Sequence, residues 1–398
     1  MDLREFKDLT SPLGQRALSA AQELAPREQD YLTHFQHLTR EYAPDLARAA
    51  LEIAILRGAA DRKFPFADRL FATRDALEQA SGWEVSTYRA ERFREFDTIV
   101  DLGCSIGSDT LAFSDHAPAV GIDIDPLRLA MARENFRAIR PSAQVALMQA
   151  DLRYSIPIWT VPFPCALFFD PSRRVEHRRV HSVHDYTPQL SIIDDWRPRY
   201  PALGVKVSPG VSLAELQGYD AEVEFISHHG SLKEAVLWFG PLKRCSRRAA
   251  ILPGPHFLES DLPEDVLRKR KLPLSQPLAY LYEPDPAVLR AGLVYDLGER
   301  INAYQLDPDI AYLVSDQKVV TPFARAWMVE DWMPFGLKKL RAYLREREVG
   351  RVIVKKRGSP LQPEELIQKL KLKGHDVRVV FLTHLQGRPI VVICYPAA

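Results

Sequence analysis

One stretch, residues 98–126, constrains the fold of this chain more than any other. An apolar run ends in Asp101, the chain turns through Gly103 and Gly107, and a second short apolar run ends in Asp123 about twenty residues later. The order of strand, glycine turn, helix, strand and acidic residue is typical of the front half of a nucleotide-binding, doubly wound α/β domain. The sequence therefore predicts a parallel sheet with helices on both faces.

The spacing of the glycines indicates which nucleotide such a domain would bind. Gly103 and Gly107 are four residues apart, so the Gly-x-Gly-x-x-Gly pattern that brings backbone close to a pyrophosphate is broken. Asp101 and Asp109 place two carboxylates around the loop, where they would repel a diphosphate but suit an ammonium and a sulfonium group. This favours S-adenosyl-L-methionine over NAD, and a domain of this fold that binds no nucleotide stays open as the alternative.

The predicted cofactor contacts follow the strand ends. The glycine loop and its two carboxylates would shape the methionine end, Asp123 would bind the ribose hydroxyls, and Asp151 the adenine amino group. The full set of cofactor-binding candidates is Asp101, Gly103, Ser105, Gly107, Asp109, Asp123, Ile124, Asp151 and Leu152.

A second edge feature follows the apolar run 165–169, which is typical of a buried central strand. That run delivers Asp-Pro-Ser-Arg-Arg, residues 170–174, to the carboxyl edge of the sheet, where the methyl acceptor should lie. A fifth strand, 203–207, would bring a lysine to the same edge. The catalytic candidates are Asp170, Pro171, Arg173 and Lys206.

The residues after Asp170 also limit the chemistry. Many amino-group methyltransferases carry an aromatic residue here that stacks on a base, whereas this chain has Ser172 and Arg173. Arginines in and after this segment would instead meet a phosphate or carboxylate of the substrate: Arg173, Arg174, Arg178 and Arg179. A cytosine-C5 mechanism is disfavoured, because Cys165 lies inside the strand and would point into the sheet packing.

Length and pattern divide the 398 residues into four expected segments: a helical domain at 1–70, the cofactor-binding domain at 71–245, a connecting region with a small α+β unit at 246–325, and a basic domain at 326–398. The proline-rich stretch 241–277 is predicted to be a connection. An antiparallel hairpin, 222–227 with 235–239, should end the sheet. Arg89 and Arg92, before the first strand, could face the substrate, but the favoured interpretation is that they are solvated helix positions.

Net charge is only +1, but its distribution is uneven. Residues 338–378 hold thirteen Lys or Arg against five Asp or Glu. A turn in this segment contains Lys355, Lys356 and Arg357, and it would form a phosphate cradle for RNA. A solvated surface is the alternative interpretation of such a charge run.

Other features exclude whole classes of protein. The sequence has no apolar run long enough for a membrane span and no signal-peptide pattern, which predicts a cytoplasmic protein without a membrane partner. Four widely spaced cysteines predict reduced, mostly buried thiols and no zinc site. The adjacent His228 and His229 lack further ligands, so no metal is expected.

Taken together, the motifs resemble those of bacterial class I methyltransferases that carry a C-terminal THUMP-like domain. The resemblance covers roughly residues 70–398 and rests on 101–109, 121–126, 170–174, 206–210, 232–240, 282–285 and 355–358. It implies S-adenosylmethionine binding, a small ferredoxin-like unit near 278–320 and, through THUMP domains elsewhere, a structured RNA substrate such as rRNA or tRNA. Methylation of a small molecule or protein, and a non-catalytic RNA-binding protein of the same fold, remain the alternatives.

Overall fold

The computed structural model describes residues 1–398 except 155, 157–163, 176–177, 180–181 and 397–398. The chain divides into two compact units, each described by itself below. Unit 1 comprises Met1–Glu222 and Lys233–Arg244, and unit 2 comprises Val223–Leu232 and Cys245–Ala398. The finer boundaries expected at 70, 245 and 325 stay predictions.

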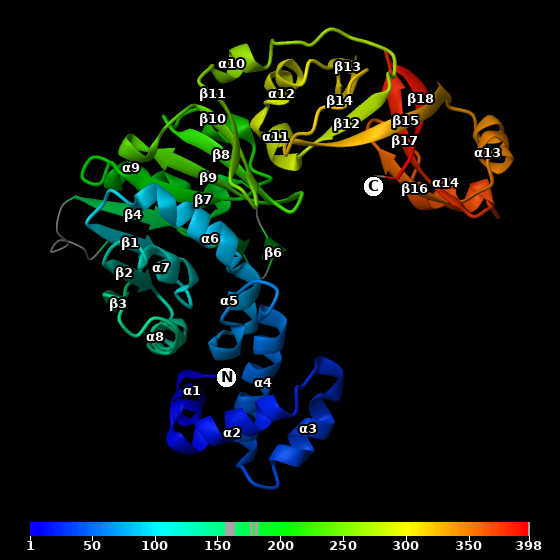
Figure 1. The fold of residues 1–398 in the computed structure, drawn as a ribbon. Helices are drawn as coiled ribbons and strands as arrows, with labels where there is room; N and C mark the ends of the chain where they lie inside the picture. Colours follow the sequence, from blue (N-terminus) through cyan, green and yellow to red (C-terminus); the bar gives the residue numbers. More distant parts are fainter. Residues whose placement is uncertain (155, 157–163, 176–177, 180–181, 397–398) are drawn as a thin grey trace. The chain divides into compact units, whose positions relative to one another are not determined.

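Unit 1 begins with helices, as the sequence predicted for residues 1–70 (Figure 1). Asp2 and Glu5 form a capping box at the first helix, and Ser11 caps the second just before a proline at its first position. The helices that precede the sheet are α1 Leu3–Thr10, α2 Pro12–Glu23, α3 Tyr31–Leu38, α4 Pro44–Ala60, α5 Arg74–Gln79 and α6 Trp83–Ala90.

These helices share one apolar core with the two helices that follow the first strands, α7 Ser108–Phe113 and α8 Pro126–Ile139. Ile106 and Phe136 are buried in that core. Asn135 is fully buried, and its amide donates to the carbonyls of Phe71 and Ile106 at 3.0 Å each and accepts from the Phe71 N–H at 2.7 Å. The cofactor loop is thereby tied to the segment that leaves the helical bundle.

The unit 1 sheet has the predicted strands. Its members are β1 Thr98–Leu102, β2 Ala119–Asp123, β3 Val145–Gln149, β4 Cys165–Phe169, β7 Leu203–Val207 and β9 Ser231–Phe239. They lie in the order β9-β7-β4-β1-β2-β3, in which β7 to β3 run parallel and β9 is antiparallel to β7. This is the expected Rossmann-like doubly wound arrangement. The loop after β4 forms two short strands, β5 Arg174–Val175 and β6 Arg178–Arg179, and a short helix, α9 Ile193–Trp196, precedes β7.

The terminal hairpin is confirmed, and one prediction beside it is wrong. Strand β8 Glu222–His228 adjoins β9 through a turn with positive φ at His229 and Gly230. The stretch 241–277, predicted to be a connection, instead contains β10 Arg247–Leu252, which pairs parallel to β8, β11 His256–Ser260, which pairs antiparallel to β10, and α10 Glu264–Leu267. Ion pairs with glutamates explain the error, because they neutralise Arg247 and Arg248 and let these residues lie buried in a strand.

Unit 2 also contains a seven-stranded sheet in the order β13-β14-β12-β15-β18-β17-β16. Its strands are β12 Tyr280–Pro284, β13 Tyr304–Asp307, β14 Ile310–Ser315, β15 Ala324–Pro334, β16 Val349–Lys356, β17 Asp376–Leu385 and β18 Arg388–Cys394. Gly292, at φ +74°, separates α11 Pro286–Ala291 from α12 Val294–Arg300. Helices α13 Leu337–Glu346 and α14 Pro363–Leu370 share an apolar core with β16, β17 and β18.

Two further expectations can be compared with this structure. Cys104, Cys165, Cys245 and Cys394 are all buried and free, as predicted. Within the described ranges, no helix combines the length and the apolar character needed to cross a bilayer.

Candidate active site

The glycine loop follows β1 and passes close to the end of β4 at Gly103. Gly103 has φ +86°, Ser105 +51° and Gly107 +80°. A Cβ on Gly103 would lie 2.7 Å from the carbonyl oxygen of Asp170, so only glycine allows the loop to pass the end of β4. The two motifs that the sequence singled out are therefore in direct contact.

Asp123, at the end of β2, holds the middle of this loop. Its carboxylate accepts the backbone N–H of Ser105 at 2.8 Å and that of Asp125 at 2.9 Å. The next side chain, Ile124, is 54% exposed. The Ser105 hydroxyl is buried and has no hydrogen-bond partner in the described structure. An orphaned buried hydroxyl is costly, and a bound polar ligand would satisfy it.

Asp101 is buried beneath the loop. The hydroxyl of Thr110, on α7, donates to its Oδ2 at 2.5 Å. Burial, reinforced by the nearby carboxylates of Asp109 and Asp170, raises the pKa of Asp101 to about 8. Asp101 is therefore mostly protonated at neutral pH, and it can donate a hydrogen bond as well as accept one.

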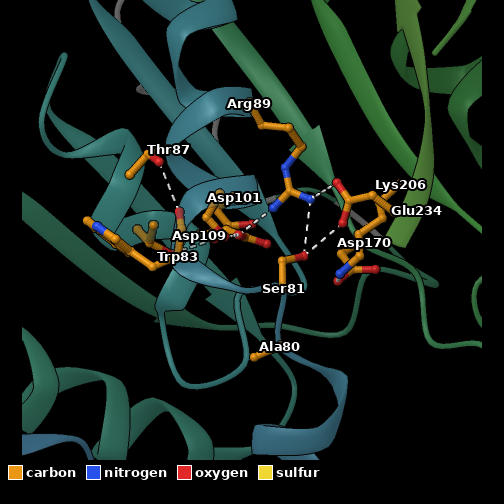
Figure 2. Close-up of polar contacts among 12 residues, drawn as sticks. Ala80, Ser81, Trp83, Thr87, Arg89, Asp101, Asp109, Asp170, Lys206 and Glu234 are labelled. Atoms are coloured by element: carbon orange, nitrogen blue, oxygen red, sulfur yellow. Dashed lines mark hydrogen bonds and ion pairs between the residues drawn. The ribbon is translucent and has the colours of Figure 1, made fainter. Parts of the chain in front are cut away.

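Arg89, on α6, lies at the centre of a buried charged cluster (Figure 2). Its guanidinium donates to the carboxylates of Asp109 on α7 and Glu234 on β9, and its Cζ lies 4.6 Å from the centre of the Phe168 ring. Burial opposes the charge, but Asp109 and Glu234 keep the pKa of Arg89 above its usual value. The interpretation of Arg89 as a solvated residue is wrong, since these two acidic groups compensate its burial.

The surroundings of Arg89 fix both carboxylates. Ser81 donates to Glu234 Oε2 at 2.9 Å and accepts from Arg89 at 3.2 Å, and Ser86 donates to Asp109 at 2.5 Å. Burial alone would raise the pKa of Asp109, but the positive charges of Arg89 and Lys206 hold it below its ordinary value.

Arg92, the other arginine interpreted as solvated, is also buried. It forms a bidentate ion pair with Glu222, and both N–O distances are 2.9 Å. The interpretation of Arg92 as a solvated residue is therefore also wrong, because the carboxylate of Glu222 compensates the charge of the buried guanidinium.

Asp170 and Lys206, both predicted from strand ends, meet at the carboxyl edge of the sheet. The Lys206 Nζ lies 2.7 Å from Asp170 Oδ2. The Lys206 side chain is 3% exposed, whereas that of Asp170 is 24% exposed, so the carboxylate is the member of the pair that a second molecule can reach. Pro171 is buried and Arg173 is half-buried beside it.

The remaining candidates lie further out. Asp151 binds the exposed Arg153 in an ion pair, and Leu152 is buried. The side chains of Arg174, Arg178 and Arg179, predicted to meet substrate, lie outside the described residues.

Sequence reasoning missed Ser81, Glu234 and Tyr186. Glu234 stands at the head of an apolar strand segment, a position that signals a buried and therefore partnered carboxylate. Tyr186 is 2% exposed, and its hydroxyl accepts the Ser208 N–H at 2.8 Å. Tyr186 therefore holds the backbone of the segment after β7, and its buried ring is not exposed for stacking on a substrate base.

Comparison with known proteins gives the class of the chain. A family described as THUMP domain-like matches residues 324–396, and a domain of unknown function (DUF8688) matches residues 2–60. The crystal structure of a "putative methyltransferase" from Porphyromonas gingivalis W83 has a TM-score of 0.76 at 21% identity and covers 94% of this chain and 100% of that one. This likeness shows the fold, a Rossmann-like α/β domain, and the family match adds a C-terminal THUMP-like domain.

Sequence relatives define the family more closely. The chain is 35% identical over 319 residues to an "uncharacterized S-adenosylmethionine-dependent methyltransferase" in two strains of Mycobacterium tuberculosis, across 79% of this chain and 84% of the relative. A shorter match, 33% identical over 61 residues, covers 15% of this chain and 26% of trimethylguanosine synthase from Schizosaccharomyces pombe. The chain belongs to the family of S-adenosylmethionine-dependent methyltransferases, and its cofactor is S-adenosyl-L-methionine.

Proposed function

We propose that this enzyme methylates a base in structured RNA. The observation that carries the proposal is the THUMP domain-like match over residues 324–396, which coincides with the strongly basic part of the chain. The short match to an enzyme named for trimethylguanosine adds support. RNA binding by such a segment would be driven by its contacts to phosphates.

We assign the cofactor to the carboxyl ends of β1, β2 and β3. Asp101, Asp109 and the Ser105 hydroxyl would hold the methionine end, because the first two are buried acidic groups and the third is a buried donor without a partner. Asp123 would hold the ribose and the exposed Ile124 would cover the adenine. Asp151 would meet the adenine amino group by sharing its carboxylate with Arg153. When bound, the cofactor supplies an electrophilic methyl group.

Asp170 is the residue that we place against the acceptor. Its carboxylate is partly exposed and is oriented by Lys206, so it would accept a hydrogen bond from the nucleophile and align it for direct displacement. Pro171 would fix the backbone at this position, and Arg173 would meet a phosphate next to the target base.

The basic domain offers two groups of cations. In the predicted cradle, Lys355 pairs with Glu283, Lys356 lies 2.8 Å from the Gln362 side chain, and Arg357 stacks on Tyr312, so these cations already have partners. A second group lies along α13 and just after α14. We call it the α13–α14 basic face, and it comprises Lys338, Arg341, Arg345, Lys371 and Lys373.

This second face is held together by its own contacts. Lys338, Arg341 and Arg345 follow helical spacing on one side of α13, and the last two donate to the backbone carbonyls of Lys369 and Lys371. Lys338, Arg345, Lys371 and Lys373 are exposed. We therefore expect the α13–α14 basic face to contribute more to RNA affinity than the cradle.

Transfer of a labelled methyl group to separated RNA, DNA and protein fractions tests the proposal. Labelled nucleosides from RNA are the expected result, and label in protein or in small molecules alone would overturn it. Lys371→Glu with Lys373→Glu should weaken RNA binding more than ten-fold and flatten its salt dependence. Lys355→Glu with Lys356→Glu is the matched charge-reversal control, with a smaller expected loss.

A further inference from the structure

Six ionisable side chains, five from different helices and strands and one from the loop after β4, converge behind the cofactor loop. They are Arg89, Asp101, Asp109, Asp170, Lys206 and Glu234, and Figure 2 shows them as one group. Arg89, Lys206 and Glu234 are each at most 3% exposed. Charges this deeply buried must compensate one another, because water screens them poorly.

The charges of this cluster do not balance. Asp109, Asp170 and Glu234 face two cations, Arg89 and Lys206, and the fourth carboxyl group, Asp101, is largely neutral at pH 7. One negative charge is therefore in excess. The Asp170 side chain is 24% exposed, so a bound cation of charge +1 can approach the cluster there and balance the excess.

The cofactor and its product differ by this one charge. S-adenosylmethionine has a fixed positive sulfonium, and loss of the methyl group leaves the neutral thioether of S-adenosylhomocysteine. All other groups of the two molecules are the same. A site with one excess negative charge therefore favours the methyl donor over the spent product.

We propose that Glu234, positioned by Arg89, is a specificity-determining residue that makes the site prefer the cationic cofactor to its neutral product. Glu234 acts through its charge. Arg89 fixes it by bridging from Glu234 to Asp109. This inference concerns only the cofactor, so it stands whether or not RNA is the acceptor.

Isothermal titration calorimetry of the full chain with each of the two molecules tests the proposal. Glu234→Gln keeps the size of the side chain and removes its charge, and it should weaken S-adenosylmethionine about ten-fold while changing S-adenosylhomocysteine less than two-fold. Ser81→Ala removes a hydrogen bond to Glu234 but no charge, and it should leave the affinity ratio unchanged. An equal loss of both affinities, or no change in their ratio, would overturn the proposal.

A variant of opposite sign covers the case in which Glu234→Gln does not fold. Lys206→Met removes a positive charge from the same cluster, so the affinity ratio should shift toward S-adenosylmethionine. A purely structural role of these residues predicts no such reversal. A shift of the ratio in the same direction for both variants would therefore contradict the electrostatic account.

Discussion

Replacing Asp101 by asparagine should change how the stability of this protein depends on pH. Asp101 lies beneath the cofactor loop, 1% exposed, and the Thr110 hydroxyl donates to it. Its folded-state pKa is about 8, compared with about 3.9 for an unperturbed aspartate. Between these two values the folded protein holds a proton that the unfolded chain has lost.

The magnitude follows from this difference in bound protons. Each pH unit between about 4 and 8 costs the wild type up to about 1.4 kcal/mol of unfolding free energy, because folding must take up a proton. The contribution is fully present below the unfolded pKa and is lost as the pH rises through the folded pKa. Asparagine does not titrate, so the variant should gain about 2.7 kcal/mol relative to wild type between pH 5 and pH 7.

Urea denaturation of the protein without cofactor, at one-unit steps from pH 5 to pH 9, measures this difference. The free energy of Asp101→Asn minus that of wild type should rise up to pH 8 and then level off. Asp97→Asn, an exposed carboxylate on the segment before β1, is the matched control for removal of one acidic group. A difference for Asp101→Asn that is constant from pH 5 to pH 8 would refute the argument that burial keeps Asp101 protonated.

Three substitutions test other contacts. Glu222→Gln leaves the buried Arg92 without its counter-charge and should cost about 3–5 kcal/mol in urea denaturation, whereas Glu91→Gln at the exposed pair with Arg94 should cost under about 1 kcal/mol; equal losses would contradict the burial argument. Asn135→Leu removes three buried hydrogen bonds and should lower stability by about 3 kcal/mol, and an unchanged melting temperature would show that they contribute nothing. Gly103→Ala places a Cβ 2.7 Å from the Asp170 carbonyl oxygen and should abolish cofactor binding in calorimetry, unlike Gly218→Ala, which meets no atom within 4 Å.

Local pattern predicted the strand ends well, for a physical reason. Parallel strands place their carboxyl ends at one edge, so Asp101, Asp170 and Lys206 had to gather there once the strands were assigned. The 2.7 Å contact between Asp170 and Lys206 follows from that geometry.

Contacts between distant segments could not be predicted in this way. Arg89 and Glu234 are 145 residues apart, and on its own an arginine on a short amphipathic helix indicates a solvated side chain. The strand β10 was missed for the same reason. In the sequence, the two charged residues Arg247 and Arg248 indicate an exposed segment. The structure shows that Glu264 and Glu259 form ion pairs with them, which allows the strand to be buried. Charge compensation is a property of the tertiary structure, and periodicity carries no signal of it.

The helical bundle at the N-terminus should be part of the enzyme's core and not a removable addition. Helices α1 to α4 pack against Met131 and Phe136 of α8. They also bury Ile106, which lies in the glycine loop between Ser105 and Gly107. A truncated chain, 61–398, would keep the hydrogen bond from Asn135 to Ile106 but would expose the apolar surface behind the loop. We expect it to aggregate or to bind S-adenosylmethionine at least ten-fold more weakly by calorimetry. A soluble 61–398 chain with wild-type affinity would show instead that the cofactor loop keeps its shape without the bundle.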